Sequence, residues 1–295
     1  MTANRLISAV LTSALGLCGT ASSFAAKEIK LRIYNPAGVS NEAYPFTVGV
    51  PFARGELEPD APIRLFDAGD EPIPVQQRVT ATWDKTGTST RWLLLDFVTA
   101  LESRDATLTL RTETPPPIAV ASRNLARETA DAIVLDTGRV RLSISKRRFN
   151  LFEQAWADLN HNGQYDSSEG LLAAKDLAGP YVRNGVGKEF WAVHDPNVEV
   201  ELEENGPIKA VVKAKGFYTS TNGKPYCQFI VRVTAHRGMT WVRTDQTFVY
   251  TEDSDKDHVL TDIGCRVPLR EPVREYQFGV VGSTALKGSC GTETV

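Results

Sequence analysis

The residues best suited to chemistry form one twelve-residue segment, 158–169, in which oxygen-bearing residues stand at positions 1, 3, 5, 9 and 12 and Gly163 at position 6. This is the spacing of the EF-hand calcium loop, in which alternate residues direct oxygen atoms toward one centre and a glycine permits the sharp bend. Calcium takes roughly six to eight oxygen ligands. We therefore predict calcium as a bound cofactor, with Gln164 acting through its carbonyl, Asp166 directly or through water, and Glu169 through both oxygens. The full predicted ligand set is Asp158, Asn160, Asn162, Gln164, Asp166 and Glu169.

The flanks of this loop determine what kind of calcium site it is. Residues 149–156 fit either a short helix or a strand, and the segment from Leu171 onward is ambiguous. A regulatory EF-hand needs a helix on each side. The preferred interpretation is therefore a loop between two strands in which calcium is structural, and the competing one is a polar turn without metal. A second acidic run, 252–258, lacks the glycine and the spacing and is interpreted as a solvated turn.

Catalytic residues are not identifiable by motif. The sequence contains no G-x-S-x-G segment and no phosphate-binding glycine loop, and its histidines stand in no nucleophile, zinc or hydrolase motif. We therefore assign no catalytic residue. The four histidines are His161, His194, His236 and His258.

Aromatic residues near turns in the second half of the chain could stack on sugar rings, although filling the core is the competing interpretation. Trp191 stands beside His194 and Asp195 and is the best candidate for an exposed ring, so Trp191 and His194 are the predicted glycan contacts. Trp92 and Trp241 lie in strand-like segments and are predicted to be in the core. The aromatic residues considered for sugar contact are Tyr181, Phe190, Trp191, Tyr218 and Tyr226.

The elements that position these residues are predicted to be β-strands. Residues 29–33 alternate apolar and charged side chains, a period of two. Between residues 35 and 96, Pro and Gly recur too often for helices. The run 91–97 is apolar on both faces, which is typical of a central strand. The first domain is therefore predicted to be a small barrel or sandwich.

The three prolines at 115–117 favour an extended connector between two domains. Beyond them, residues 198–203 and 209–215 form the clearest hairpin, with Glu203 expected opposite Lys209 and Val200 opposite Val212. Long antiparallel strands favour a β-sandwich. The predicted architecture is all-β, with a leader at 1–26, a small β-barrel domain at 27–114, an antiparallel β-sandwich at 119–286 that carries the calcium loop, and a disordered tail at 287–295.

The first 26 residues have the layout of a signal peptide. Arg5 precedes an apolar run from Leu6 to about Leu17, and small residues then lead to a cleavage site after Ala25 or Ala26. Export to the periplasm or the medium is therefore expected, without a membrane anchor after cleavage. The formal charge is −3 for the full chain and becomes −4 once Arg5 is removed, which argues against nucleic acid as a partner.

Three cysteines follow the leader, namely Cys227, Cys265 and Cys290, so the exported chain has room for one intramolecular disulfide. Cys227 and Cys265 both lie in strand-like segments, whereas Cys290 lies in a segment rich in Gly and Ser. The preferred pairing is therefore Cys227 with Cys265.

An ordered set of short phrases resembles the exo-rhamnogalacturonan lyase (YetA-like) family. The phrases lie mostly in the first domain, with weaker ones in the second, and together they span most of the chain after the leader. They are 35–38, 46–55, Arg64-Leu65, 74–76, 91–97, 205–207, 247–249 and Asp257-His258. The resemblance implies an N-terminal barrel of the RIFT type, a central β-sandwich and a large α/α toroid after them. Because no run of amphipathic helices occurs here, we expect this chain to correspond to the front portion alone.

Three functional hypotheses follow. The leading one is a secreted, calcium-stabilised, non-catalytic unit that binds pectic or other acidic plant-type polysaccharides. The second is a polysaccharide lyase that acts by β-elimination, alone or with a separate catalytic α/α toroid chain. β-Elimination needs a base for the C5 proton and a cation or donor for the carboxylate, and a calcium ion with a full set of protein ligands leaves few positions for substrate. The third is a cell-envelope interaction module without sugar affinity.

Overall fold

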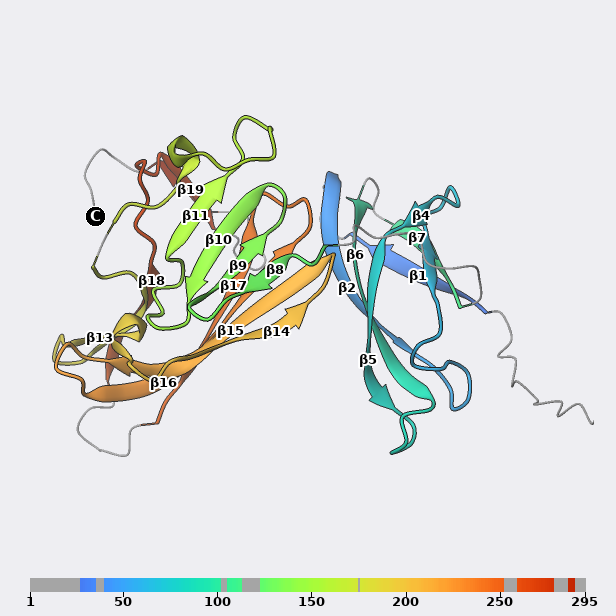
Figure 1. Cartoon of the computed structure of the whole chain (residues 1–295), viewed down its shortest axis with the longest axis horizontal. Helices are drawn as coiled ribbons and strands as arrows, with labels where there is room; N and C mark the ends of the chain where they lie inside the picture. The colour runs from blue at the N-terminus through green and yellow to red at the C-terminus, as the bar shows by residue number, and fades with distance from the viewer. Residues whose placement is uncertain are drawn as a thin grey trace, which may run out of the picture.

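The computed structural model describes residues 27–35, 40–101, 105–112, 123–174, 176–251, 259–278 and 286–289. The predicted leader, the connector at 115–117, the acidic run at 252–258 and Cys290 lie outside these residues. Within them the chain forms twenty β-strands and two short 3-10 helices, and no α-helix, which confirms the all-β prediction. Figure 1 shows the strands in two groups, the N-terminal one in blue to blue-green and the C-terminal one in green to red.

The N-terminal domain is built from two antiparallel sheets with the strand orders β1-β7-β3-β4 and β2-β6-β5. Leu93, Leu95 and Phe97 on the central strand β6 are at most 1% exposed, because alternate residues of a strand point to the same face. They form the core of this domain with side chains of the other sheet. The strands are β1 (Glu28–Tyr34), β2 (Asn41–Pro51), β3 (Arg64–Phe66), β4 (Pro72–Ile73), β5 (Val75–Thr82), β6 (Thr90–Leu101) and β7 (Asp105–Arg111).

The second domain packs a four-stranded sheet, β11-β10-β9-β8, against a larger one in the order β17-β16-β15-β13-β12-β18, with β14 paired to β15. Its core joins residues of both sheets with Phe149, which lies between β10 and β11 and stacks on Phe229 of β16 with the ring centroids 5.7 Å apart. Its elements are β8 (Ala126–Glu128), β9 (Ala132–Asp136), β10 (Val140–Ser145), β11 (Gln154–Ala157), η1 (Ser167–Glu169), β12 (Gly179–Asn184), β13 (Glu189–Trp191), η2 (Ala192–His194), β14 (Glu199–Asn205), β15 (Lys209–Thr219), β16 (Pro225–His236), β17 (Val242–Val249) and β18 (Leu260–Arg266).

Two details of the predicted β-structure need correction. In the β14–β15 hairpin Glu201 lies opposite Lys213 and Leu202 opposite Val212, so the predicted register is wrong by two residues, and a bulge separates Leu202 from Glu204. This shift of two leaves the side chains from Glu199 to Leu202 on their predicted faces. Between the bulge and the turn, Asn205 lies opposite Ala210, where Leu202 was predicted, so the register differs there by three. Residues 287–289, predicted to begin a disordered tail, belong to β20 (Leu286–Ser289), because β19 (Glu275–Phe278) provides an antiparallel partner.

Trp92 and Trp241 do not fill the core as predicted, since they are 42% and 43% exposed. Trp92 alternates with Leu93 along β6 and therefore faces away from the core. Trp241 precedes β17 and lies in the turn after β16, so no strand holds it against a sheet.

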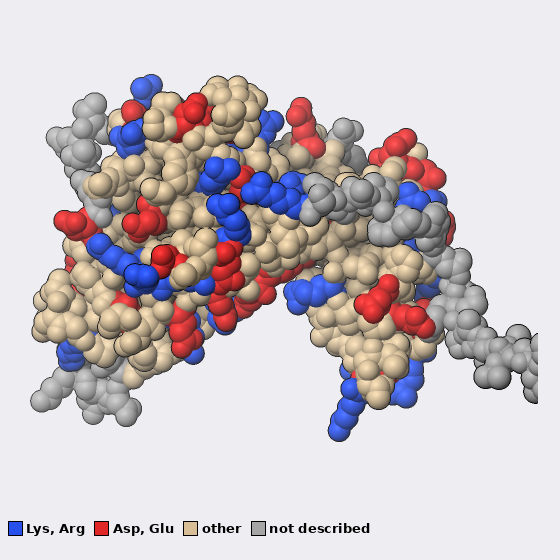
Figure 2. Space-filling view, in the orientation of Figure 1, with Lys and Arg blue, Asp and Glu red and all other residues tan. Residues whose placement is uncertain are grey.

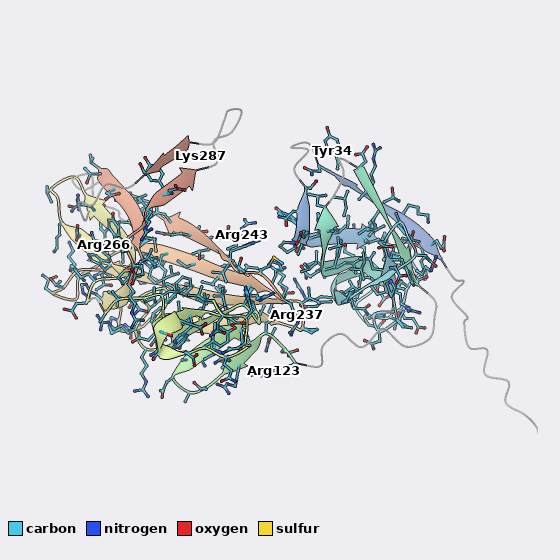
Figure 3. All side chains as sticks on the ribbon, turned by 90° about the horizontal axis from the view of Figure 1, so that it is seen from above. Tyr34, Arg123, Arg237, Arg243, Arg266 and Lys287 are labelled. Carbon is cyan, nitrogen blue, oxygen red and sulfur yellow. The ribbon has the colours of Figure 1, made fainter. Side chains whose placement is uncertain are left out.

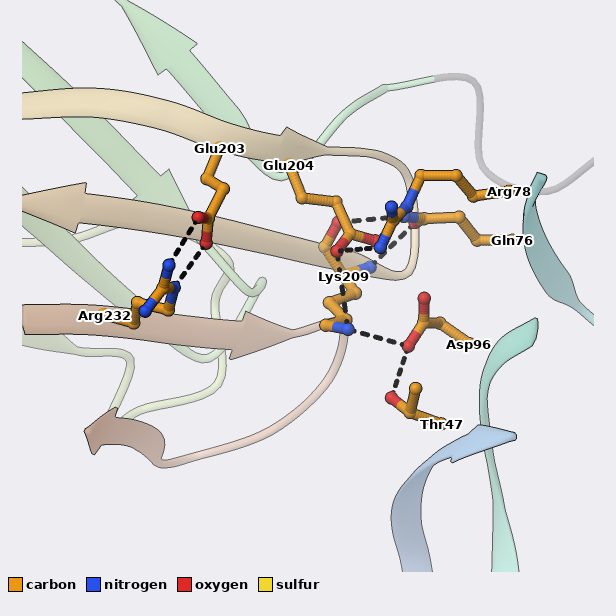
Figure 4. A network of polar contacts seen from close by, with 8 residues as sticks. All are labelled: Thr47, Gln76, Arg78, Asp96, Glu203, Glu204, Lys209 and Arg232. Atoms are coloured by element: carbon orange, nitrogen blue, oxygen red, sulfur yellow. Dashed lines mark hydrogen bonds and ion pairs between the residues drawn. The ribbon is translucent and has the colours of Figure 1, made fainter. Parts of the chain in front are cut away.

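The two domains meet through polar groups that converge on the β14–β15 turn (Figure 4). The Gln76 carboxamide accepts hydrogen bonds from the backbone N–H of Ile208 (3.0 Å) and Lys209 (2.9 Å) and donates to Glu204 Oε1 (2.9 Å). Lys209 Nζ lies 3.0 Å from Asp96 Oδ1 and 3.4 Å from Glu204 Oε2. Asp96 is 1% exposed. A largely buried ammonium group therefore lies between carboxylates of the two domains.

Gly206 allows the β14–β15 turn to approach the Gln76 side chain closely. A Cβ added at Gly206 would overlap with the Gln76 carboxamide, which is held by the hydrogen bonds just described. Gly206→Ala is therefore expected to displace Gln76 and lower the free energy of unfolding by about 2 kcal/mol, measured by urea denaturation. In a Gln76→Ala background the same change is expected to cost less than about 0.5 kcal/mol. Equal costs in both backgrounds would contradict a steric role for Gly206.

His236 makes the stability of this region depend on pH. It lies opposite Lys209 in the β15–β16 pairing, is 8% exposed, and has a buried Nδ1 without a partner in the described structure. Burial, with the charge of Lys209, lowers the pKa of His236 to about 4. In the unfolded chain His236 takes up a proton near pH 6.5, whereas in the folded chain it stays neutral down to about pH 4. The free energy of unfolding is therefore highest above pH 6.5 and decreases as the pH falls from 6.5 toward 4.

Between pH 7 and pH 5 this effect is expected to cost the protein about 2 kcal/mol, measured by denaturant titration at each pH. Burial raises the pKa of Glu204 and contributes with the opposite sign, so the quantity to compare is the difference between the wild type and His236→Phe. The variant is expected to lose less stability on acidification. Parallel pH curves for the two proteins would show that His236 is not the titrating group.

Candidate calcium loop

The predicted calcium loop lies between two extended segments. β11 ends at Ala157, and after η1 the chain returns beside β11, with a bridge between Trp156 and Gly170 and a hydrogen bond from Leu171 N to Ala155 O (2.8 Å). Neither flank is helical. The loop therefore closes a pair of neighbouring extended strands, unlike the helix–loop–helix arrangement of a regulatory EF-hand.

The first and last predicted ligands face the same loop backbone. Asp158 and Glu169 are 6% and 4% exposed. The Asp158 carboxylate accepts from Asn162 N (3.0 Å) and Gly163 N (3.2 Å). The Glu169 carboxylate accepts from Leu159 N (2.9 Å) at one oxygen and, at the other, from the backbone N–H of Asp166 (3.0 Å). Both carboxylates therefore point into the turn.

The middle of the loop is a tight turn that exposes its polar groups. His161 and Gly163 have φ values of 60° and 74°, in the left-handed region that glycine tolerates best. The side-chain oxygen of Asn160 accepts from Asn162 N at 3.0 Å, and that of Asn162 accepts from Gln164 N at 2.7 Å. Asn160, Asn162, Gln164 and Asp166 are all exposed.

The charges in this loop fit a cation of the calcium type. Neither Asp158 nor Glu169 forms an ion pair with a basic side chain in the described part of the chain. Two buried carboxylates without a counter-charge are unfavourable, and a bound cation removes this cost. Among the described residues no three His, Cys, Asp or Glu side chains gather as metal ligands. Hard oxygen atoms from the amides and the backbone would therefore have to complete the calcium shell.

Tyr165, at position 8 of the loop, connects it to the rest of the sandwich. Its hydroxyl donates to Asp136 Oδ1 (3.0 Å), and the guanidinium of Arg141 lies 4.2 Å from its ring centroid. Asp136 also pairs with Arg141 at 2.8 Å. Burial, followed by the hydrogen bond to Asp136, raises the pKa of Tyr165, so its hydroxyl stays protonated at neutral pH.

The prediction that Trp191 is an exposed sugar contact is wrong. Trp191 is 1% exposed, because Tyr181 stacks on its ring at 4.7 Å between centroids and Arg266 lies 5.0 Å from the ring centroid. His194, predicted as its partner, is half-buried with Nδ1 3.2 Å from Thr219 O. Three other aromatic residues that were considered for sugar contact are also buried in the core, namely Phe190, Tyr218 and Tyr226.

The predicted disulfide between Cys227 and Cys265 is also absent. Neither cysteine forms a disulfide bond among the described residues. Cys227 is completely buried on β16, whereas Cys265 is exposed on β18. In the order of the large sheet, β15, β13 and β12 lie between these two strands.

A pocket that sequence reasoning missed lies beside the calcium loop. It has a volume of about 150 Å³ and is lined by residues 123–127, Val134, Asp136 and Arg141. Its walls come from three strands and from the segment before β8, so no local motif could reveal it. The only sequence signal was the recurrence of arginine at 123, 127 and 141 in an acidic chain. Across the described residues, no helix is long and apolar enough to cross a membrane.

The fold defines a two-domain all-β protein, with a small barrel followed by an antiparallel sandwich. Residues 29–112 match the model of the PcRGLX-like N-terminal RIFT barrel domain, and residues 125–278 match that of the PcRGLX-like protein central β-sandwich domain. The chain belongs to the PcRGLX-like family. This confirms the fold class and the resemblance to the front part of the rhamnogalacturonan lyase (YetA-like) family.

Two individual proteins are similar to parts of the chain. The uncharacterized protein YetA of Bacillus subtilis (strain 168) is 25% identical over 199 residues, which cover 66% of this chain and 22% of YetA. The chain therefore spans about a fifth of the length of that relative. The structure of a protein in the glycosyl hydrolase family 38 from Enterococcus faecalis is also similar. The match covers 88% of this chain and 35% of the Enterococcus faecalis chain, with a TM-score of 0.48 and 12% identity.

Proposed function

We propose that this chain is an exported, calcium-stabilised unit that binds acidic glycans of the pectic class without cleaving them by itself. The match of both domains, in order, to the PcRGLX-like family carries this proposal. The buried carboxylates of Asp158 and Glu169 support calcium, because calcium prefers hard oxygen ligands and no basic side chain of the described residues pairs with either group. Residues 158–169 would hold the ion, and its charge would keep this long loop folded against β11.

The glycan part of the proposal is tested with the purified full chain and three polysaccharides. Rhamnogalacturonan and polygalacturonate are expected to bind in calorimetric titrations, whereas neutral galactan, the matched control, is expected not to bind. The unsaturated sugar that β-elimination produces is followed by ultraviolet absorbance in the same samples. Absence of binding to both acidic polymers would contradict the proposal, and formation of unsaturated product by the lone chain would replace it with the lyase hypothesis.

Export is the remaining part of the proposal, and the layout of residues 1–26 supports it. Mass spectrometry of the protein recovered outside the cytoplasm is expected to give an N-terminus at Ala26 or Lys27. A protein that stays in the cytoplasm with residues 1–26 retained would contradict export.

A further inference from the structure

We infer that the pocket formed by β8, β9 and β10 is a subsite for one sugar ring that carries a carboxylate. The inference deepens the proposed function and rests on it for the polymer, but the pocket itself is defined by its own geometry. The pocket is lined by residues 123–127 and, from the facing strands, by Val134, Asp136 and Arg141. In Figure 2, Lys and Arg side chains gather over the part of the sandwich domain that holds β8–β10 in Figure 1.

Two of the three arginines in the pocket are available to an anion. Arg123 and Arg127 are exposed, and neither guanidinium pairs with a carboxylate in the described structure. Several other arginines on this domain do have acidic partners, such as Arg232 with Glu203 at 2.6 Å. A chain with a formal charge of −3 repels a polyanion in general, so an acidic glycan needs a local positive site of this kind.

The third arginine is held in place. Arg141 donates to Asp136 Oδ2 from Nε (3.1 Å) and Nη2 (2.8 Å) and stacks on Tyr165. Asp136 is fixed in turn by Gly138 N (2.9 Å) at its other oxygen. Burial works against ionisation of Asp136, but these hydrogen bonds and the Arg141 charge lower its pKa. The Arg141–Asp136 pair is therefore a charged, preorganised wall of the pocket.

The backbone wall of the pocket is equally fixed. Leu125 N donates to Gly206 O (3.0 Å) and Ala126 N to the side chain of Asn205 (3.1 Å), which ties the wall to the β14–β15 turn. The guanidinium of Arg237 donates to Arg123 O at 2.5 Å. Figure 3 shows Arg123 and Arg237 together at the end of the sandwich domain that is nearest the N-terminal domain.

Size and chemistry favour a sugar acid over other anions. A volume of 150 Å³ corresponds to roughly five water molecules at about 30 Å³ each, which is room for one ring and not for a chain. Guanidinium groups bind a planar carboxylate with two parallel hydrogen bonds. Leu125 and Val134 offer apolar contact for ring C–H groups. The negative charge of Asp136 disfavours a phosphate dianion.

The test compares galacturonate with galactose, which differs at the carboxylate, in ligand-observed NMR titrations of the full chain. Galacturonate is expected to bind and galactose is not. Arg127→Ala is expected to weaken galacturonate binding about tenfold, because a charge-assisted hydrogen-bond pair is lost. Arg127→Lys keeps the positive charge but loses the planar guanidinium group that can donate two parallel hydrogen bonds, and it is expected to weaken binding about threefold. Arg243→Ala, which removes an exposed arginine on β17, is the matched control and is expected to leave binding unchanged.

Three results would overturn the subsite. They are absence of galacturonate binding to the wild type, equal binding of galactose, and unchanged galacturonate binding in Arg127→Ala. Inorganic phosphate is titrated as well, and tighter binding of phosphate than of galacturonate would reject the sugar-acid assignment. If the acidic polymers bind while Arg127→Ala has no effect, the proposed function stands and only the subsite is wrong. Melting curves of each variant establish that the fold is retained.

Discussion

Lys209→Met is expected to lower the free energy of unfolding by about 3–5 kcal/mol. The Lys209 ammonium group is the only basic group described within 4 Å of Asp96, and Asp96 is 1% exposed. The substitution keeps the length of the side chain but leaves the Asp96 carboxylate without a cation, whereas Glu204 keeps Arg78 at 3.7 Å. An uncompensated buried charge is costly because the interior screens it poorly. The measurement is urea denaturation followed by both fluorescence and circular dichroism.

The matched control is Lys213→Met on the same strand. Lys213 pairs with Glu201 at 2.8 Å, but Glu201 is 61% exposed, and an exposed pair of this kind contributes at most about 1 kcal/mol. Combining Lys209→Met with Asp96→Asn is expected to recover much of the loss, because the buried charge is then removed with its partner. Equal costs for Lys209→Met and Lys213→Met would show that the interface pair is solvated and does not hold the domains together.

The fold was accessible from the sequence because it depends on local patterns. Alternation of apolar and polar residues identifies strands, and frequent Pro and Gly exclude helices, so the all-β class and the order of two domains could be predicted. The register of the β14–β15 hairpin could not, because the turn is tighter than predicted, with Gly206 N bonded to Lys209 O, and a bulge near Glu203 then shifts the pairing by one residue. A bulge leaves no mark in the apolar pattern on either side of it.

The polar interface and the aromatic core depend on residues far apart in the sequence. Asp96 belongs to an apolar run, and its partner Lys209 lies 113 positions away. Trp191 on β13 is covered by Tyr181 from the adjacent strand β12 and by Arg266 from β18, the next strand of the same sheet. An aromatic residue next to a turn therefore gave no indication of whether another strand would cover it.

The calcium loop is the opposite case, since all of its candidate ligands lie within twelve residues. The spacing predicts which oxygen atoms face the centre, and the structure places Asp158 and Glu169 on the same loop backbone. The arginine pocket beside it was not predictable, because Asp136 and Arg141 reach it from two strands and Arg123 from the segment before β8. Tyr165 joins the two features through its hydrogen bond to Asp136.

Removing calcium is the second change with a large expected effect. A ligand that binds only the folded state stabilises it by about 3–4 kcal/mol when its free concentration is 100 to 1,000 times its dissociation constant. Chelation is therefore expected to lower the melting temperature of the wild type. Asp158→Ala is expected to melt at the same temperature with and without calcium, because the first ligand and its hydrogen bonds to the loop are gone.

The most direct test of the calcium-stabilised loop is a calorimetric titration of the EDTA-stripped protein with calcium, paired with melting curves and repeated on Asp158→Ala. Arg243→Ala, which changes a charge on β17 away from the loop, serves as the control. We expect one site in the wild type and the control, a calcium-dependent rise in their melting temperature, and neither response in Asp158→Ala. Absence of binding heat together with an unchanged melting temperature in the wild type would show that residues 158–169 are a polar turn and would contradict the calcium site.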